Sequence, residues 1–212
     1  VATFLTLRRK QFAAAAGLGA LAALSRPTGL LIALPASIEA WRGIRGTDRR
    51  GLATRALAVV GPFVGTFAYL LWVRGQTGDL FDPYSIQANR NFRGRTVDPV
   101  TGVSDALTQF LDHHRVGPLL HVGWAVVVVA LVIVALRKLP VSYGVFAAAV
   151  VVLALSAEKL DSFERYAFAA FPLLIAAAML VRGRKLETLV FTVSGAAMCL
   201  YTTVALLGVY LP

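Results

Sequence analysis

The sequence predicts an all-α, polytopic transmembrane helical bundle with about five full spans and a short N-terminal helical hairpin. Three observations predict it: 58% of the 212 residues are hydrophobic, only 15% are charged, and the apolar residues form long uninterrupted runs. A soluble domain of this size needs more polar surface, whereas a helix needs roughly 20 apolar residues to cross a bilayer. We therefore expect an integral membrane protein, with residues 1–212 as a single transmembrane domain.

The apolar run at residues 11–38 is predicted to form a hairpin of two short helices. Arg26 and Pro27 split it into pieces of 15 and 12 residues, each short for a crossing, because proline cannot continue a helix. Residues 1–7 are typical of the last turns of a helix, so we expect the chain to be a fragment whose N-terminal part precedes Val1. Five uncharged runs after the hairpin are predicted spans: residues 56–73, 116–136, 139–157, 166–181 and 188–212.

The basic residues indicate which loops face the cytoplasm, because cytoplasmic loops carry an excess of Lys and Arg. Only a hairpin at 11–38 puts the four basic clusters on one side of the membrane, the cytoplasmic side. On this topology the cytoplasmic loops carry 13 cations and 3 acids, and the outer loops carry 7 cations and 8 acids. The net charge of +10 is therefore an orientation signal and a predicted contact with anionic membrane lipids, and no nucleic-acid partner is expected. The clusters are Arg8/Arg9/Lys10, Arg42/Arg45/Arg49/Arg50/Arg55, Arg137/Lys138 and Arg182/Arg184/Lys185.

The outer loop at residues 74–115 is 42 residues long, which is too long for a simple connection, and is predicted to contain two short helices. Asp82 and Pro83 form an N-cap and N1 pair that predicts a helix through Tyr84, Gln87 and Asn91. Residues 103–112 are predicted to form an interfacial helix with Leu107 and Phe110 toward lipid. Its apolar stripe, with the spacing of one helix face, is Val103, Ala106, Leu107, Phe110 and Leu111.

Two places combine a charge with an apolar span, where an ionisable group is costly and is a candidate for function. Arg26 precedes Pro27, and the broken helix is expected to line a polar cavity. The alternative is an arginine that holds the hairpin. Arg165 lies at the outer entry of the span 166–181, where its guanidinium could bind a lipid phosphate with the Tyr166 hydroxyl. The alternative is an interfacial anchor, with Arg165 paired to Glu164 or Asp161 and Tyr166 in the aromatic belt.

The outer loop also gathers amide and guanidinium donors suited to a sugar or a phosphate. Gln87 and Arg90 are the candidates for substrate binding, whereas a solvated loop is the simpler interpretation of Asn89 and Arg95. The full set of donors is Gln87, Asn89, Arg90, Asn91, Arg93 and Arg95.

No metal site is predicted, because the adjacent His113 and His114 point about 100° apart on a helix. His121, one turn inside a span, is expected to form a hydrogen bond between helices, and Cys199 is expected to be a packing residue. No cofactor is evident, and the sequence leaves the use of a divalent metal open. Glycine-rich phosphate loops, nucleophile elbows and HExxH motifs are absent from the sequence.

Three stretches of the sequence resemble a known family. They are residues 19–30 (GALAALSRPTGL), the loop around Asp82-Pro83-Tyr84 and Gln87 with Arg93-Gly94, and residues 160–166 (LDSFERY) leading to Phe171-Pro172. In these residues the chain resembles the C-terminal portion of actinobacterial mannosyltransferases related to phosphatidylinositol-glycan class V, which are membrane-embedded GT-C glycosyltransferases. The likeness runs over most of the chain.

The resemblance implies an inverting transfer of a sugar, typically mannose, from a polyprenyl-phosphate donor to an acceptor hydroxyl at the outer face of a bacterial plasma membrane. Such transfer needs a carboxylate base and cations that hold the leaving phosphate. In this family the key aspartate follows the first transmembrane helix, so we expect the base upstream of Val1 and an isolated fragment without activity.

Two other classes of protein remain alternatives. A multi-pass transporter or lipid flippase subunit also uses broken helices and buried arginine, but it usually places its site between inverted repeats, and no repeat is visible. A non-catalytic scaffold subunit would use the outer loop as a partner surface. The sequence does not identify protein partners.

Overall fold

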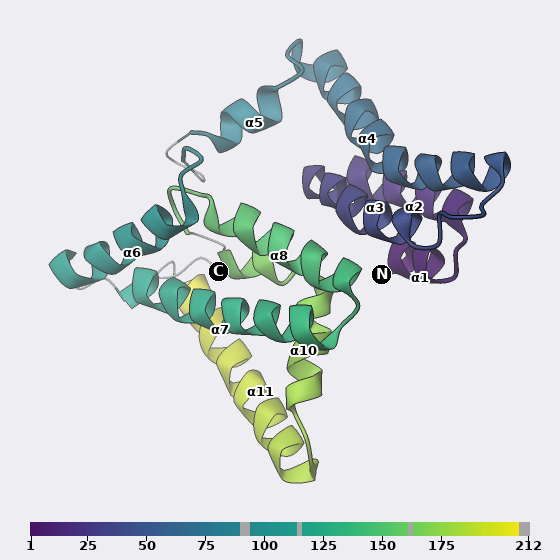
Figure 1. The fold of residues 1–212 in the computed structure, drawn as a ribbon. Helices are drawn as coiled ribbons and strands as arrows, with labels where there is room; N and C mark the ends of the chain where they lie inside the picture. Colours follow the sequence, from purple (N-terminus) through teal and green to yellow (C-terminus); the bar gives the residue numbers. More distant parts are fainter. Residues whose placement is uncertain (90–93, 114–115, 161–162, 208–212) are drawn as a thin grey trace. The chain divides into compact units, whose positions relative to one another are not determined.

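The computed structural model describes residues 1–89, 94–113, 116–160 and 163–207, and within them every regular element is a helix (Figure 1). Three helices are long and apolar enough to cross a membrane: α4 (Arg49–Thr77), the segment Leu120–Lys138 of α7 (Val116–Lys138), and α11 (Arg184–Leu206). The prediction of an all-helical membrane protein is confirmed at this level. Shorter apolar helices are α2 (Phe12–Ser25), α8 (Val141–Leu155) and α10 (Phe171–Leu180).

The predicted span at 166–181 is divided in the structure. Its residues belong to α9 (Phe163–Ala167) and α10, which are separated by a short turn. Pro172 lies in the first turn of α10, where its missing N–H costs nothing because the first N–H groups of a helix have no partner within the helix.

The chain divides into two compact units where the sequence predicts one transmembrane domain. The first comprises Val1–Ile86 with Pro140–Ala149, and the second comprises Gln87–Leu139 with Val150–Pro212. The helix α8 contributes its first half to one unit and its second half to the other.

The hairpin predicted at residues 11–38 is confirmed as a chain reversal in the first unit. The helix α2 stops at Ser25, Arg26 is extended (φ −151°, ψ 133°), and the chain returns through η1 (Pro27–Ile32) and α3 (Ala33–Trp41). Gly29 permits the reversal, because a Cβ there would lie 2.5 Å from the carbonyl oxygen of Ala22. The two ends of the hairpin share one hydrophobic cluster with α1 (Ala2–Arg8) and α4, formed by Leu7, Phe12, Ala15, Ala36, Ala40 and Ala58.

The helices α2 and α4 approach each other at small residues. A Cβ on Gly65 would lie 2.0 Å from the carbonyl oxygen of Ala20, and one on Gly61 would lie 2.4 Å from that of Ala16. Glycines four residues apart on one helix face allow such backbone contact between membrane helices, where packing replaces the hydrophobic effect. Pro62 lies between these glycines and has no N–H for the helix ladder, which accounts for the bend of α4 in Figure 1.

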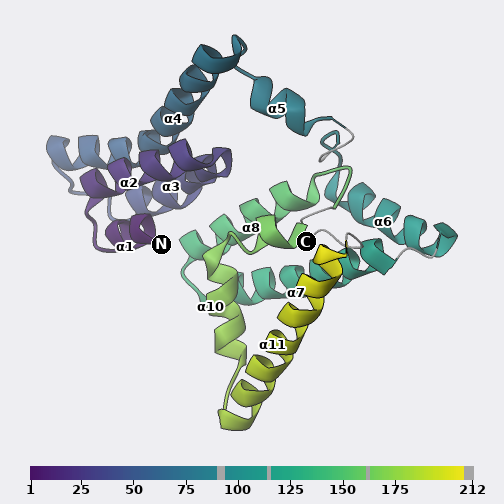
Figure 2. The same cartoon turned by 180° about the vertical axis from the view of Figure 1, so that it is seen from behind.

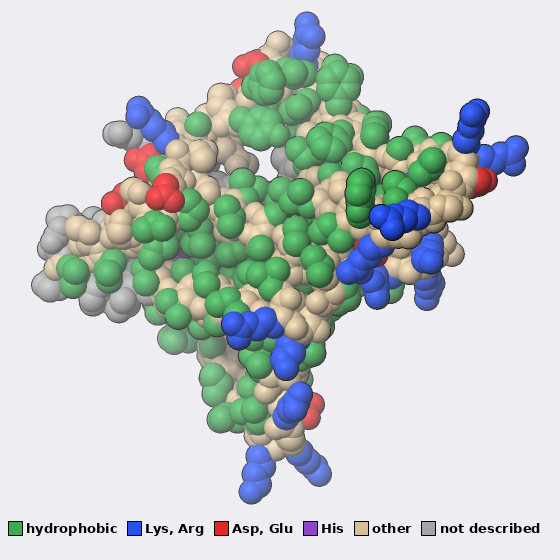
Figure 3. Space-filling view, in the orientation of Figure 1, with side chains coloured by type: hydrophobic (Ala, Val, Ile, Leu, Met, Phe, Trp, Pro, Cys, Tyr) green, Lys and Arg blue, Asp and Glu red, His purple; other side chains and the backbone are tan. Residues whose placement is uncertain are grey.

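The surface of the chain is apolar over much of its area, as the space-filling view shows (Figure 3). On α4 the side chains of Phe63, Val64 and Phe67 are exposed, and α11 has no buried residue among those described. Exposed apolar helix faces of this extent suit a lipid environment.

The outer loop contains the two predicted helices, with different bounds. The first, α5 (Asp82–Gln87), is followed by a turn and a bend at residues 88–89, so the continuous helix predicted as far as Asn91 is wrong; Asn91 itself lies outside the described residues. The Asn89 carbonyl accepts a hydrogen bond from the Gly94 N–H at 3.2 Å. The second, α6 (Pro99–His113), starts four residues earlier than predicted, because Asp98 Oδ1 accepts the Val100 N–H at 3.3 Å.

The predicted lipid-facing stripe of α6 is described in part. The side chain of Leu107 is exposed, and that of Phe110 lies outside the described side chains.

The last part of the outer loop docks on the chain that follows α8. Thr96 pairs with Ala157 in an isolated bridge, and Glu158 donates its N–H to the Arg95 carbonyl at 3.0 Å and accepts the Arg95 N–H on Oε2 at 2.9 Å. Gly94 has φ +73°, and a Cβ there would lie 2.7 Å from Glu158 Oε2. The loop is therefore attached to the second unit and is not a free tether.

Candidate functional site

The short helix α9 carries two adjacent charged residues, one buried and one exposed. Phe163, Glu164 and Ala167 are buried, whereas Arg165 between them is exposed. Glu164 Oε1 lies 2.8 Å from Nδ1 of His121, which is itself buried on α7. This pair ties α9 to α7, so the sequence-based expectation that His121 bonds between helices agrees with the structure.

The exposed face of α9 presents the guanidinium of Arg165. Its Cζ lies 5.4 Å from the ring centroid of Tyr166, within the range of a cation–π contact. Because Glu164 pairs with His121, the predicted alternative in which Arg165 pairs with Glu164 is not found, and Asp161 lies outside the described residues. Among the described side chains no carboxylate forms an ion pair with Arg165, whose N–H fork suits a phosphate or carboxylate.

Aromatic contacts join the same ends of three helices in the second unit. Trp124 of α7 donates its Nε1–H to the Tyr201 hydroxyl of α11 at 2.9 Å, and its ring meets Phe168 edge-on with centroids 5.6 Å apart. The start of α7, the entry to α10 and the end of α11 therefore lie together, as the two ribbon views allow the reader to follow (Figure 1 and Figure 2). These are the ends that the sequence predicts on the outer side.

The predicted site residues are only partly brought together. Arg165 and Tyr166 are in contact, Gln87 is exposed at the end of α5, and no described contact joins it to them. Arg26 is exposed at the break between α2 and η1, in the first unit. Arg90 lies outside the described residues.

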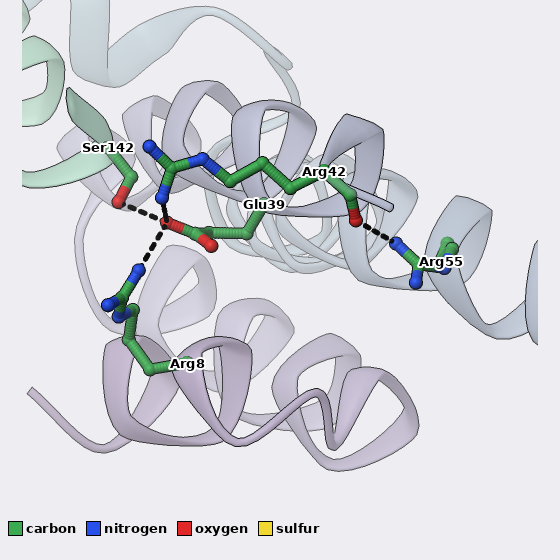
Figure 4. A network of polar contacts seen from close by, with 5 residues as sticks. All are labelled: Arg8, Glu39, Arg42, Arg55 and Ser142. Atoms are coloured by element: carbon green, nitrogen blue, oxygen red, sulfur yellow. Dashed lines mark hydrogen bonds and ion pairs between the residues drawn. The ribbon is translucent and has the colours of Figure 1, made fainter. Parts of the chain in front are cut away.

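Sequence reasoning missed a buried carboxylate in the first unit, which Figure 4 shows. Oε1 of Glu39 on α3 accepts the hydroxyl of Ser142 on α8 at 2.6 Å and the Arg42 Nη1 at 3.2 Å, and lies 3.6 Å from Arg8 Nη1 on α1. A signal for it does exist, since Glu39 is the first acidic residue of the chain and stands between two basic clusters.

A second buried charge lies beside this network. Arg55 is buried near the start of α4 and donates to the carbonyl oxygen of Arg42 at 2.9 Å (Figure 4). It also donates to the carbonyl oxygens of Ala40 (2.7 Å) and Gly43 (3.3 Å), and its guanidinium packs over the Phe12 ring at 4.6 Å. It therefore satisfies the free carbonyls at the end of α3. The first two predicted basic clusters thus meet at one end of the first unit.

Within the described ranges, no three His, Cys, Asp or Glu side chains gather closely enough to hold a metal ion. No family model, no curated protein and no solved structure matches the chain.

Proposed function

We propose that the chain is the membrane portion of a glycosyltransferase that moves a sugar, mannose in the first instance, from a polyprenyl-phosphate donor to an acceptor hydroxyl at the outer membrane face. In this proposal Arg165 holds the donor phosphate, with Tyr166 beside it. Arg26, Gln87 and Arg90 stay predicted contacts to the donor or acceptor.

One observation carries the proposal: Arg165 is exposed on α9 while the adjacent carboxylate of Glu164 is turned inward to His121. Among the described residues Arg165 forms no ion pair, so its positive charge is available to an external anion. The contact with Tyr166 restricts the guanidinium, so less conformational entropy is lost when it binds a phosphate.

The chemistry of sugar transfer uses such a group in the transition state. As the bond between the sugar and the phosphate breaks, negative charge develops on the phosphate oxygens, and a fixed cation stabilises that charge more than it stabilises the substrate. The acceptor hydroxyl loses its proton to a carboxylate base, which the proposal does not assign to a residue.

The proposal includes the topology of five spans plus the N-terminal hairpin, with the basic clusters in the cytoplasm. Two observations support this topology. Arg8 of the first basic cluster and Arg42 of the second both contact Glu39, and side-chain contacts join the predicted outer ends of α7, α10 and α11. Cysteines placed at Arg9 and Arg45 should both react with a membrane-impermeant reagent from the cytoplasmic side only. Labelling from opposite sides would contradict the hairpin topology.

Transfer from polyprenyl-phosphate-mannose by the whole protein tests the role of Arg165. The variant Arg165→Lys keeps the charge but removes the planar fork, and we expect a loss on the order of 1 to 3 kcal/mol in transition-state binding, or roughly 5- to 150-fold in kcat/KM. Arg165→Ala should lose at least as much.

The matched control is Arg95→Ala, which removes an exposed arginine of the outer loop whose side chain has no described contact. It should keep normal activity. If both Arg165 variants insert at normal levels and also transfer sugar normally, Arg165 is an interfacial anchor and the proposed site is wrong.

A further inference from the structure

We propose that Arg8 and Arg42, held on the carboxylate of Glu39, form a binding site for the phosphate headgroup of an anionic phospholipid at the end of the first unit predicted to face the cytoplasm. This inference is independent of the proposed sugar transfer, because it concerns a different unit and different residues.

The two guanidiniums are held by a fixed group. Glu39 is buried, with 8% of its side chain exposed, and the fully buried hydroxyl of Ser142 donates to its Oε1 at 2.6 Å. The Nη1 atoms of Arg42 and Arg8 lie 3.2 Å and 3.6 Å from that same oxygen. The carboxylate therefore fixes two cations that come from different helices, α3 and α1 (Figure 4).

Both guanidiniums keep donors available for a ligand. Each arginine side chain is 45% exposed, and a guanidinium has five N–H donors, of which Glu39 Oε1 engages few. Two cations against one carboxylate leave a net positive charge at the site. A phosphate oxygen placed against both arginines would complete an arrangement that the protein has already organised, at a low cost in side-chain entropy.

The surroundings of the site favour an anion. The exposed residues Arg9 and Lys10, which directly follow Arg8, add positive charge. The nearby acid Asp48 is already used, because its Oδ1 accepts the Gly51 N–H at 2.9 Å and caps α4. Arg55 does not belong to this surface, because its charge is directed at buried carbonyls.

Apolar side chains beside the cations identify the ligand as a lipid. Trp41 directly precedes Arg42 and is 76% exposed, and Leu5, one helical turn before Arg8 on α1, is also exposed. An exposed tryptophan next to arginine is typical of the headgroup level of a membrane, where the ring contacts acyl chains and the cation contacts phosphates. In Figure 3 basic side chains likewise stand beside apolar ones over the first unit.

The test measures the affinity of the whole protein for spin-labelled phosphatidylglycerol relative to phosphatidylcholine, in vesicles containing both lipids in equal parts. Removing both arginines alone would leave a buried, unpaired carboxylate and risk unfolding. The test variant is therefore the triple change Arg8→Gln, Arg42→Gln and Glu39→Gln, which lowers the net charge by one. The control Arg49→Gln lowers the net charge equally without touching Glu39.

The triple variant should lose roughly 5-fold more relative affinity for phosphatidylglycerol than the control, since a cation near the membrane surface contributes about that factor. A second variant, Arg8→Lys with Arg42→Lys, keeps all charges on Glu39 and should show an intermediate loss.

Two results would overturn the inference. Equal losses in the triple variant and the Arg49→Gln control would mean that the charge acts diffusely, with no site. In the detergent-solubilised protein, inorganic phosphate and unlabelled phosphatidylglycerol can each be tested for displacement of the spin-labelled phosphatidylglycerol. If inorganic phosphate displaces it as well as the unlabelled lipid does, the site binds a soluble anion and is not specific for lipid.

Discussion

Replacing Gly65 by alanine is expected to force the helices α2 and α4 apart. The new Cβ would lie 2.0 Å from the carbonyl oxygen of Ala20 and 2.8 Å from its Cα. These are backbone atoms of a helix, so they cannot move aside by a change of rotamer as a flexible side chain could. The contact can be relieved only by moving one helix relative to the other.

The size of the effect follows from that geometry. A carbon and a carbonyl oxygen normally approach to about 3.3 Å, so the two helices would separate by about 1.3 Å at this point. Overpacking of this kind costs about 1 to 3 kcal/mol. Alanine also has a better helix propensity than glycine by about 1 kcal/mol, which works in the opposite direction and must be removed by a control.

Gly75 supplies the control, because it lies on the same helix and a Cβ there would meet nothing within 4 Å. The propensity gain is similar in both variants, so Gly65→Ala should be less stable than Gly75→Ala by about 1 to 3 kcal/mol. Equilibrium unfolding of the purified protein in mixed micelles, followed by circular dichroism, measures the difference. If the two variants have their unfolding midpoints at the same mole fraction of denaturing detergent, α2 and α4 do not approach as closely as described.

The remaining predictions concern the second unit. Gly94→Ala should abolish the hydrogen-exchange protection of the Glu158 amide, because the added Cβ meets the Glu158 side chain. The control Gly78→Ala changes a glycine with a similar positive φ (82° against 73°) but no neighbour within 4 Å, so it should keep that protection. Protection retained in both variants would contradict the docked loop. In a double-mutant cycle, His121→Phe and Glu164→Leu should couple by roughly 1 to 3 kcal/mol, since each change removes one partner of the buried pair whose atoms lie 2.8 Å apart. Additive free energies of unfolding would mean that the pair contributes nothing.

Features that depend on local chemistry were predictable from the sequence. The helix break at Arg26 and Pro27 follows from the missing N–H of proline, and the structure has it at that place. The apolar periodicity of residues 103–112 likewise predicts the helix that is found as α6. The extent of α5 was misjudged, because the N-cap pair Asp82-Pro83 marks where a helix begins and carries no signal for its end at Gln87.

The residues of the candidate site stay a prediction from the sequence, and the side-chain pairing around them could not be predicted. The sequence singled out Arg165 and Tyr166, which are in contact. It could not tell which partner Glu164 takes, because the choice between the neighbouring Arg165 and a histidine 43 residues away depends on how α9 packs on α7.

By itself the sequence determined that this chain is helical and that much of its surface is apolar, because composition and run length fix which solvent can surround each helix. Only the tertiary structure decided which charges are withdrawn from solvent. Glu39 and Ser142 are 103 residues apart, and Arg55 reaches carbonyls 12 to 15 residues before it. A buried charge is stable only where partners from other elements converge on it, and that convergence is a property of the packed helices.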